Sequence, residues 1–104
     1  MLVPYPLGQG SSAKKRPALV ISPEDYNQAT GEVIIAQITS RVSTPPRPGD
    51  YRIQGWQEAK LPRPALVRAR LATLKASQVL RKLGRLTEVD LRAVQEALRG
   101  VICQ

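Results

Sequence analysis

The hydrophobic residues of this chain fall into short runs that are separated by polar segments rich in proline and glycine. Runs of four to eight residues between turn signals are typical of β-strands. The run at 33–36 has no polar alternation, which predicts burial on both of its faces. The pattern predicts strands at 2–5, 18–21, 32–39, 51–53 and 64–71, and a last strand or helical segment at 79–86.

A short helix is predicted after the second of these strands. Ser22 is placed as its N-cap, Pro23 as its first helical residue, and two acids follow in the first turn. The helix is expected to end near Ala29, where Thr30 and Gly31 turn the chain into the next strand.

A longer helix is predicted at the end of the chain. The segment from Thr87 to Asp90 is similar to a capping box, with Asp in the position that Glu usually takes. Apolar residues then recur at helical spacing and form one stripe, made of Leu91, Val94, Leu98, Val101 and Ile102.

Together these elements indicate a mainly β fold, a small twisted sheet or barrel packed by a C-terminal helix. The segment 43–50 is too rich in proline to be anything but a loop. The chain has no internal repeat and no linker long enough to divide it, so we expect residues 1–104 to form a single domain.

Charge narrows the choice of partner. The chain of 104 residues carries a formal net charge of +8, and the stretch 59–86 holds eight basic residues and no acid. Such clustering favours a surface that contacts nucleic acid over a surface that is only solvated. The chain has four aromatic residues, which argues against stacking base after base, and we expect Trp56 to belong to the core.

Several classes of protein are excluded or disfavoured. With one cysteine and no histidine, the chain can form neither an internal disulfide nor a Cys/His zinc site. The first residues do not resemble a signal peptide, and no apolar run reaches the length of a membrane span. We therefore expect a cytoplasmic protein that has no membrane partner.

Polar chemistry gathers at the ends of two buried strands. Arg16 opens the first and Thr39 closes the second, so antiparallel pairing would bring them together. A guanidinium beside a hydroxyl suits a phosphate, because arginine can donate two parallel charged hydrogen bonds. Lys14 and Lys15, expected on the preceding loop, would add weak contacts to backbone phosphates.

The residues at these positions resemble a known family. The block Arg-Pro-Ala-Leu-Val-Ile-Ser at 16–22, followed in order by Thr-Ser at 39–40, is similar to the toxin components of MazF/PemK-type toxin–antitoxin systems. Further matching segments cover almost the whole chain and lie at 15–23, 26–27, 30–31, 38–40, 56–68 and 83–87.

The resemblance implies an SH3-like small barrel with a C-terminal helix, a homodimer, and an endoribonuclease that cuts single-stranded RNA without a metal or another cofactor. It also implies a cognate acidic antitoxin that covers the dimer groove. Arg16 and Thr39 match the family's catalytic arginine and threonine, and Arg68 lies where some members carry a further active-site arginine. The remaining residues expected to contact RNA are Lys14, Lys15, Ser40, Arg41 and Arg70.

The chain departs from the family pattern in its proton carriers. The first loop lacks the acid or histidine that some members carry, and Arg70 stands where others have aspartate. Of Arg68 and Arg70 we expect only one to face the site, and we choose Arg68. Charge stabilisation and alignment would still support cleavage, at a lower rate.

Two alternative functions remain open at this level. A relative without efficient proton transfer could hold RNA or an antitoxin without cutting. A gyrase poison is built on the same barrel, but it acts through the terminal helix and would leave the match at Arg16 and Thr39 without explanation.

Overall fold

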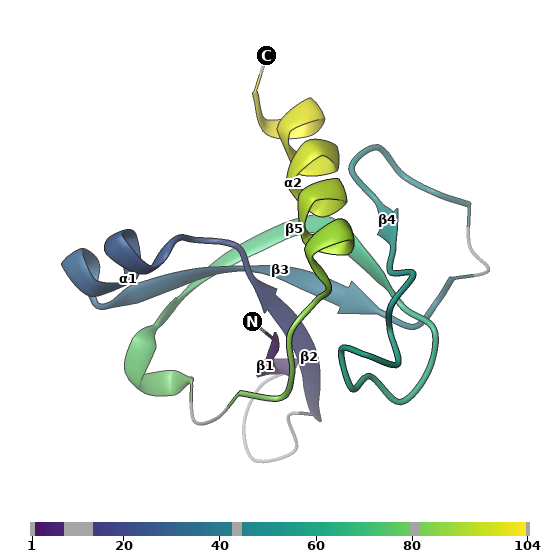
Figure 1. Cartoon of the computed structure of the whole chain (residues 1–104). Coiled ribbons are helices and arrows are strands. Elements are labelled where there is room, and N and C mark those ends of the chain that lie inside the picture. Colours follow the sequence, from purple (N-terminus) through teal and green to yellow (C-terminus); the bar gives the residue numbers. More distant parts are fainter. Residues whose placement is uncertain (1, 8–13, 43–44, 80–81, 104) are drawn as a thin grey trace.

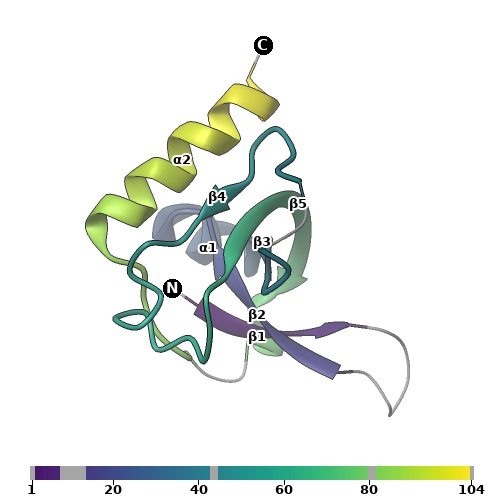
Figure 2. The same cartoon turned by 90° about the vertical axis from the view of Figure 1, so that its right-hand side faces the viewer.

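The computed structural model describes residues 2–7, 14–42, 45–79 and 82–103. Five antiparallel strands form one curled sheet in the order β1-β2-β3-β5-β4 (Figures 1 and 2). The prediction of a mainly β fold with a C-terminal helix is confirmed. The elements are β1 (Leu2–Leu7), β2 (Lys14–Val20), α1 (Glu24–Thr30), β3 (Glu32–Thr39), β4 (Tyr51–Arg52), β5 (Leu66–Lys75), the 3-10 turn η2 (Ala76–Gln78) and α2 (Glu88–Ile102).

Apolar side chains pack on both faces of the sheet, because successive residues of a strand point to opposite sides. The larger cluster lies under α2 and includes Leu2, Leu19, Ile38, Val67 and Val94. The smaller cluster lies on the other face and consists of Val3, Ala18, Val20, Val33 and Ile35. Trp56 packs half-buried against the larger cluster, as expected from the sequence.

The β1–β2 hairpin is longer than the sequence pattern indicates. β1 continues past Pro6 to Leu7, and β2 begins at Lys14, so Lys14 and Lys15 belong to a strand and not to the expected loop. β1 is an edge strand in the sheet order, and an edge tolerates a proline that lacks an N–H group.

β3 has the predicted bounds, but its burial differs from the prediction. Ile34 is only partly buried, whereas Ile35 and Ala36 are buried. The pairing with β5 shifts register between Ala36 and Gln37, so two residues of β5 have no direct partner there. Such irregularities bend a strand and raise its twist, which suits the curl of this sheet.

The predicted last strand at 79–86 is wrong for the residues described there. Gly84 makes a single bridge with Leu2, and β5 itself extends to Lys75. A Cβ atom at Gly84 would lie 2.1 Å from the carbonyl oxygen of Ala59. The backbone at Gly84 therefore packs directly against the backbone of Ala59. This contact favours two segments that cross, rather than a long strand ladder.

Ser22 does not cap α1. The N-cap is Pro23, and the Ser22 hydroxyl accepts a hydrogen bond from the Ile34 amide while donating to Asn27. Ser22 thus links the end of β2 to both α1 and β3. The predicted turn after the helix is confirmed, because Gly31 adopts a left-handed conformation with φ of 70°.

Thr87 caps α2 as predicted, and its hydroxyl accepts a hydrogen bond from the Asp90 amide at 3.2 Å. The apolar stripe is buried only in part. Val94 and Leu98 are buried, but Val101 and Ile102 are 39% and 55% exposed, so the last turn of the helix extends beyond the core. Within the described residues, no helix is long and apolar enough to cross a membrane.

Candidate functional site

The β2–β3 ladder ends close to the residues singled out by the sequence. The predicted antiparallel pairing is confirmed, and its last pair toward this end joins Ala18 to Gln37. Pro17 follows, and a proline cannot donate a further ladder hydrogen bond. Arg16 and Thr39 each lie two residues beyond the last pair, on the two strands that separate there.

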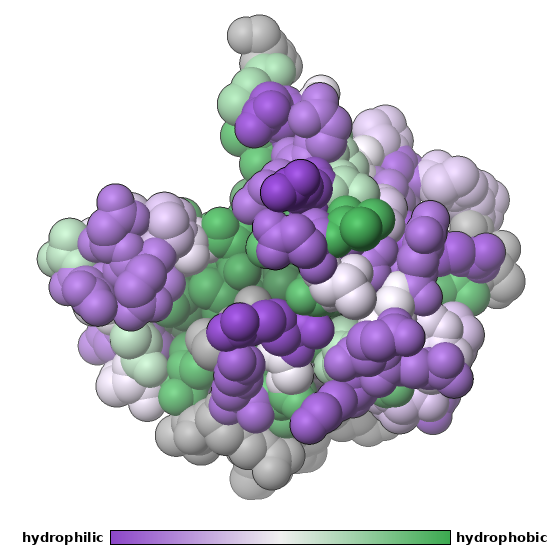
Figure 3. Space-filling view, in the orientation of Figure 1, coloured by the Kyte–Doolittle hydropathy of each residue, from purple (hydrophilic) through white to green (hydrophobic). Residues whose placement is uncertain are grey.

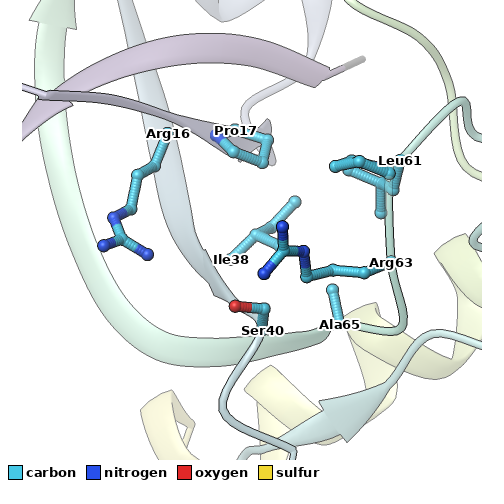
Figure 4. A pocket seen from close by; sticks show the side chains of 8 residues that line it. Arg16, Pro17, Ile38, Ser40, Leu61, Arg63 and Ala65 are labelled. Atoms are coloured by element: carbon cyan, nitrogen blue, oxygen red, sulfur yellow. The ribbon is translucent and has the colours of Figure 1, made fainter.

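A cavity of about 320 Å³ opens at this point. It lies between the start of β2, the end of β3 and the segment 61–65 that precedes β5. Figure 4 shows Arg16 descending from β2 on one side, with Arg63 reaching toward it from the other and Ser40 at the end of β3. The lining residues are Arg16, Pro17, Ile38, Ser40, Leu61, Pro62, Arg63 and Ala65.

The cavity has an apolar floor and a positively charged rim. Ile38, Leu61 and Ala65 are buried, whereas Arg16 and Arg63 are exposed. Low-dielectric walls beside two cations concentrate a positive potential, which attracts anions. The lining residues described here include no carboxylate that would neutralise the two arginines.

Thr39 does not line this cavity. It lies between the lining residues Ile38 and Ser40, and alternation along the strand turns its side chain to the face opposite theirs. Its Oγ1 atom accepts a hydrogen bond from the Arg41 amide at 3.2 Å. Ala18 and Gln37 are direct partners, so Arg16 and Thr39, each two residues beyond them, point to the same face of the sheet. Arg16 and Ser40 line the cavity, whereas Thr39 does not.

Arg68 is engaged by a carboxylate. Its Nε and Nη2 atoms each donate to Asp50 over 3.1 Å, and the two side chains are 14% and 3% exposed. Burial raises the pKa of Asp50, but hydrogen bonds from Arg68 and the Arg47 amide, with the charges of both arginines, bring that pKa below its usual value. Arg68 lies opposite Gln37, so it shares a face with Thr39.

The other expected RNA contacts are dispersed. Arg70 is exposed on β5, two residues beyond Arg68 and opposite the register shift. Arg41 is exposed after β3. The side chains of Lys14 and Lys15 lie outside what the structure describes, although their backbone belongs to β2.

Sequence reasoning missed Arg63. Its signal is the tripeptide Pro62-Arg63-Pro64, because prolines on both sides hold the backbone extended and present the long side chain to one side. The stretch 56–68 carries part of the family resemblance and part of the basic charge. Nothing local, however, links Arg63 to Arg16, which lies 47 positions earlier in the chain.

A buried carboxylate joins α2 to the segment after β4. Asp90 is fully buried and accepts hydrogen bonds from Tyr51 Oη, from the Gln54 amide at 3.1 Å and from the Gly55 amide at 2.8 Å. Burial raises its pKa, but these donors bring it below the usual value. Burial, the bond to Asp90 and the charge of Asp90 raise the pKa of Tyr51 to about 12.

A second, apolar cavity of about 210 Å³ lies between the end of β2 and α2. Figure 3 shows the corresponding apolar surface between α1 and α2, with hydrophilic residues around it. Among its described lining residues only Gln95, Arg99 and Cys103 carry polar or reactive groups, so it lacks the convergent cations of the first cavity. No three His, Cys, Asp or Glu residues gather into a metal-binding group in the described part of the chain.

Comparison with known proteins assigns the family. A sequence model described as "PemK-like, MazF-like toxin of type II toxin-antitoxin system" matches residues 1–102. The chain belongs to the PemK/MazF toxin family. Among curated proteins, none matches the chain.

Solved structures of PemK/MazF toxins have the same fold. The Mycobacterium tuberculosis toxin MazF-mt6 is similar with a TM-score of 0.74 at 20% identity, over 94% of this chain and 91% of that one. MazF from Deinococcus radiodurans is similar with a TM-score of 0.71 at 25% identity, over 99% and 93%. The expected small barrel of this toxin fold is thus confirmed.

A third similar structure is a mycobacterial endoribonuclease in complex with its cognate antitoxin. Its TM-score is 0.74 at 21% identity, over 94% of this chain and 86% of that one.

Proposed function

We propose that this PemK/MazF-family chain is an endoribonuclease toxin that cuts single-stranded RNA without a metal ion or another cofactor. Residues 1–104 act as one domain, within a homodimer in the cytoplasm, and a cognate acidic antitoxin restrains them. The observation that supports this proposal is the convergence of Arg16 and Arg63 on one cavity at the end of the β2–β3 ladder.

The proposed reaction is attack by a ribose 2′-oxygen on the adjacent phosphorus. The new bond joins this oxygen to phosphorus, the bond to the 5′-oxygen breaks, and a 2′,3′-cyclic phosphate remains. The attacking hydroxyl loses a proton to solvent, and the departing 5′-oxygen gains one from water. Negative charge accumulates on the phosphoryl oxygens between these events.

Arg16 stabilises this charge in the proposal. Its exposed guanidinium can donate two hydrogen bonds to phosphoryl oxygens. The backbone of Arg16 is held in β2, so the position from which the side chain extends is fixed. Charge that is already oriented toward a developing anion is commonly the largest contribution to catalysis.

Thr39 aligns the phosphate or the 2′-hydroxyl. Because Thr39 Oγ1 accepts a hydrogen bond from the Arg41 amide, its own hydroxyl hydrogen can be directed to an RNA oxygen. We assign Arg68 the third catalytic role, through the positive charge that it holds on the same face as Thr39. Lys14, Lys15, Ser40, Arg41 and Arg70 contact the RNA.

The test is to incubate the purified protein with mixed RNAs in a chelating buffer and to analyse the ends of the products. We expect fragments ending in 2′,3′-cyclic phosphate, and we expect Arg16→Ala to abolish them. Arg92→Ala is a matched control, because Arg92 lies on α2 with a side chain that is 77% exposed and pairs with Glu88 at 3.6 Å. Intact RNA at high protein concentration would reject the proposal.

A second candidate function is binding without cleavage. It is favoured by the cavity lining, in which no described residue is a carboxylate, and by the lack of histidine in the whole chain. General acid–base catalysis is worth about 100-fold or more, so its absence could leave a protein that only holds RNA or its antitoxin. Salt-dependent RNA binding together with intact RNA would identify this function.

A further inference from the structure

The cavity beside Arg16 contains more apolar surface than a phosphate requires. Ile38, Leu61 and Ala65 are 3%, 7% and 4% exposed and form its floor, and Pro17 and Pro62 form its walls. A phosphate group gains nothing from an apolar floor, because its oxygens require hydrogen-bond donors or water. The volume of about 320 Å³ is at the small end of the range for organic ligands, which suits a single heterocyclic ring.

We propose that this cavity holds one unpaired nucleobase next to the phosphate bound by Arg16. The base lies against Pro17, Ile38 and Leu61, and the Arg63 guanidinium covers its exposed face. Ser40 presents a hydroxyl to the edge of the base. This assignment rests on the proposed function, because the base belongs to the RNA strand whose phosphate Arg16 binds.

The chemistry of the lining fits a flat ring better than a charged or purely aliphatic group. Unpaired bases in RNA are recognised by stacking on aromatic rings or on arginine planes and by hydrogen bonds at their edges. No described aromatic residue lines the cavity, so the stacking surface is the plane of Arg63. A serine hydroxyl can both donate and accept, which lets Ser40 distinguish base edges.

The position of Arg63 agrees with this role. Figure 4 shows its side chain extended across Ile38 toward Arg16, and not folded back on its own segment. Arg63 is exposed, so its guanidinium can move onto a bound ring without leaving a buried site.

The experiment measures binding and does not need cleavage. The probe is a short oligonucleotide in which every ribose is 2′-O-methylated, so it has no nucleophile, and a series in which one position at a time is abasic. For the wild-type protein we expect one abasic position to weaken binding about 10-fold, in line with the loss of one stacked base. The other positions should change affinity less than threefold.

Substitutions at Arg63 connect this penalty to the cavity. Arg63→Ala should weaken binding of the complete oligonucleotide about 10-fold and reduce the abasic penalty to less than twofold. Arg63→Lys keeps the positive charge but lacks the planar guanidinium, so it should also lose the abasic penalty. It should bind the abasic probe as tightly as the wild type does. Arg92→Ala removes one charge from the outer face of α2 and should retain the full penalty.

Two results would overturn the assignment. One is an abasic penalty that is absent in the wild-type protein or equal in Arg63→Ala and wild type. The other is a change in the methyl resonances of Ile38 and Leu61 with a glutamate-rich peptide but not with the oligonucleotide, which would assign the cavity to an acidic protein segment. If the protein does not cleave RNA, the abasic penalty is still measurable, so failure of the nuclease proposal is seen separately.

Discussion

Arg68 and Asp50 form a bidentate ion pair, in which each of two N–O distances is 3.1 Å, beside the end of β5 that pairs with β4. Asp50 also accepts a hydrogen bond from the Arg47 amide at 2.9 Å. The pair therefore links the proline-rich segment before β4 to β5, the strand that pairs with β3 beside Thr39. Because the Asp50 side chain is only 3% exposed, its charge depends on these partners.

Loss of Arg68 should destabilise the protein. Arg68→Ala leaves the Asp50 carboxylate nearly buried without its main partner, and the expected decrease in the free energy of unfolding is about 3 kcal/mol. Urea denaturation measures it. In the double variant with Asp50→Asn most of this decrease should be recovered, and a decrease of the same size in both variants would contradict the role of the buried charge.

Stability should fall in acid because of two carboxyl groups. The folded-state pKa values of Asp50 and Asp90 lie below the ordinary 3.8, so both groups bind protons more tightly in the unfolded chain. Their stabilisation is fully present above pH 4 and is lost as the pH falls through the folded-state values. Thermal denaturation between about pH 2 and pH 6 tests this, and Asp50→Asn should flatten the dependence.

Tyr51 should ionise unusually late. Its pKa is raised from 10.0 to about 12 by burial and by Asp90, so the unfolded chain loses this proton first. The stabilisation from Tyr51 is present below pH 10 and is lost as the pH rises toward 12. Ultraviolet titration of tyrosinate should show one late group, which Tyr51→Phe removes, and a late group that persists in that variant would refute the assignment.

Two glycines should respond in opposite directions to the same substitution. A Cβ atom at Gly84 would lie 2.1 Å from a backbone oxygen, so Gly84→Ala forces the chain apart and should cost about 1–3 kcal/mol. Gly100 has nothing within 4 Å of that position and lies within α2, where alanine is favoured by about 1 kcal/mol. Comparison of the two melting temperatures with that of the wild type checks both.

Arg16 and Thr39 should differ in their effect on cleavage. Arg16→Ala removes the charge proposed to face the phosphate and should lower the cleavage rate by about 100-fold or more. Thr39→Ala removes one neutral hydrogen bond, worth about 1 kcal/mol, and should lower the rate by about fivefold. Single-turnover kinetics with excess protein measures both rates.

Thr39→Ser should retain most of the rate, because it keeps the hydroxyl. Thr73→Ala, at an exposed position of β5, is the matched control and should leave the rate unchanged. An equal loss in Thr39→Ala and Thr73→Ala would show that the hydroxyl of Thr39 has no special part in the reaction.

Local patterns predicted most of the elements and failed where a distant segment intervened. β3 and the start of α2 were predicted at their observed bounds, because unbroken apolar runs and a threonine cap are local signals. Ser22 was misplaced as a cap because its hydroxyl is bonded to Ile34, twelve residues away. The last strand was misplaced because Gly84 lies against Ala59, a contact that no local pattern encodes.

The candidate site divides in the same way. Arg16 and Thr39 stand at strand ends in the sequence itself, and the antiparallel pairing that relates them is confirmed. The side of the sheet that each faces depends on register and pleat. The register places Arg16, Thr39 and Arg68 on one face, although Thr39 does not line the cavity and Arg68 is paired with Asp50 from a loop 18 residues earlier in the chain.

The sequence by itself determined the family through its short motifs, the mainly β fold through its apolar periodicity, and the strong positive charge through its composition. Only the tertiary structure decided which cations share a cavity. Arg16 and Arg63 are 47 positions apart in the chain, and they converge because Pro17 ends the β2–β3 ladder and the segment before β5 occupies the space where the strands separate. Contacts between distant segments arise from packing and strand register, which no local pattern of residues contains.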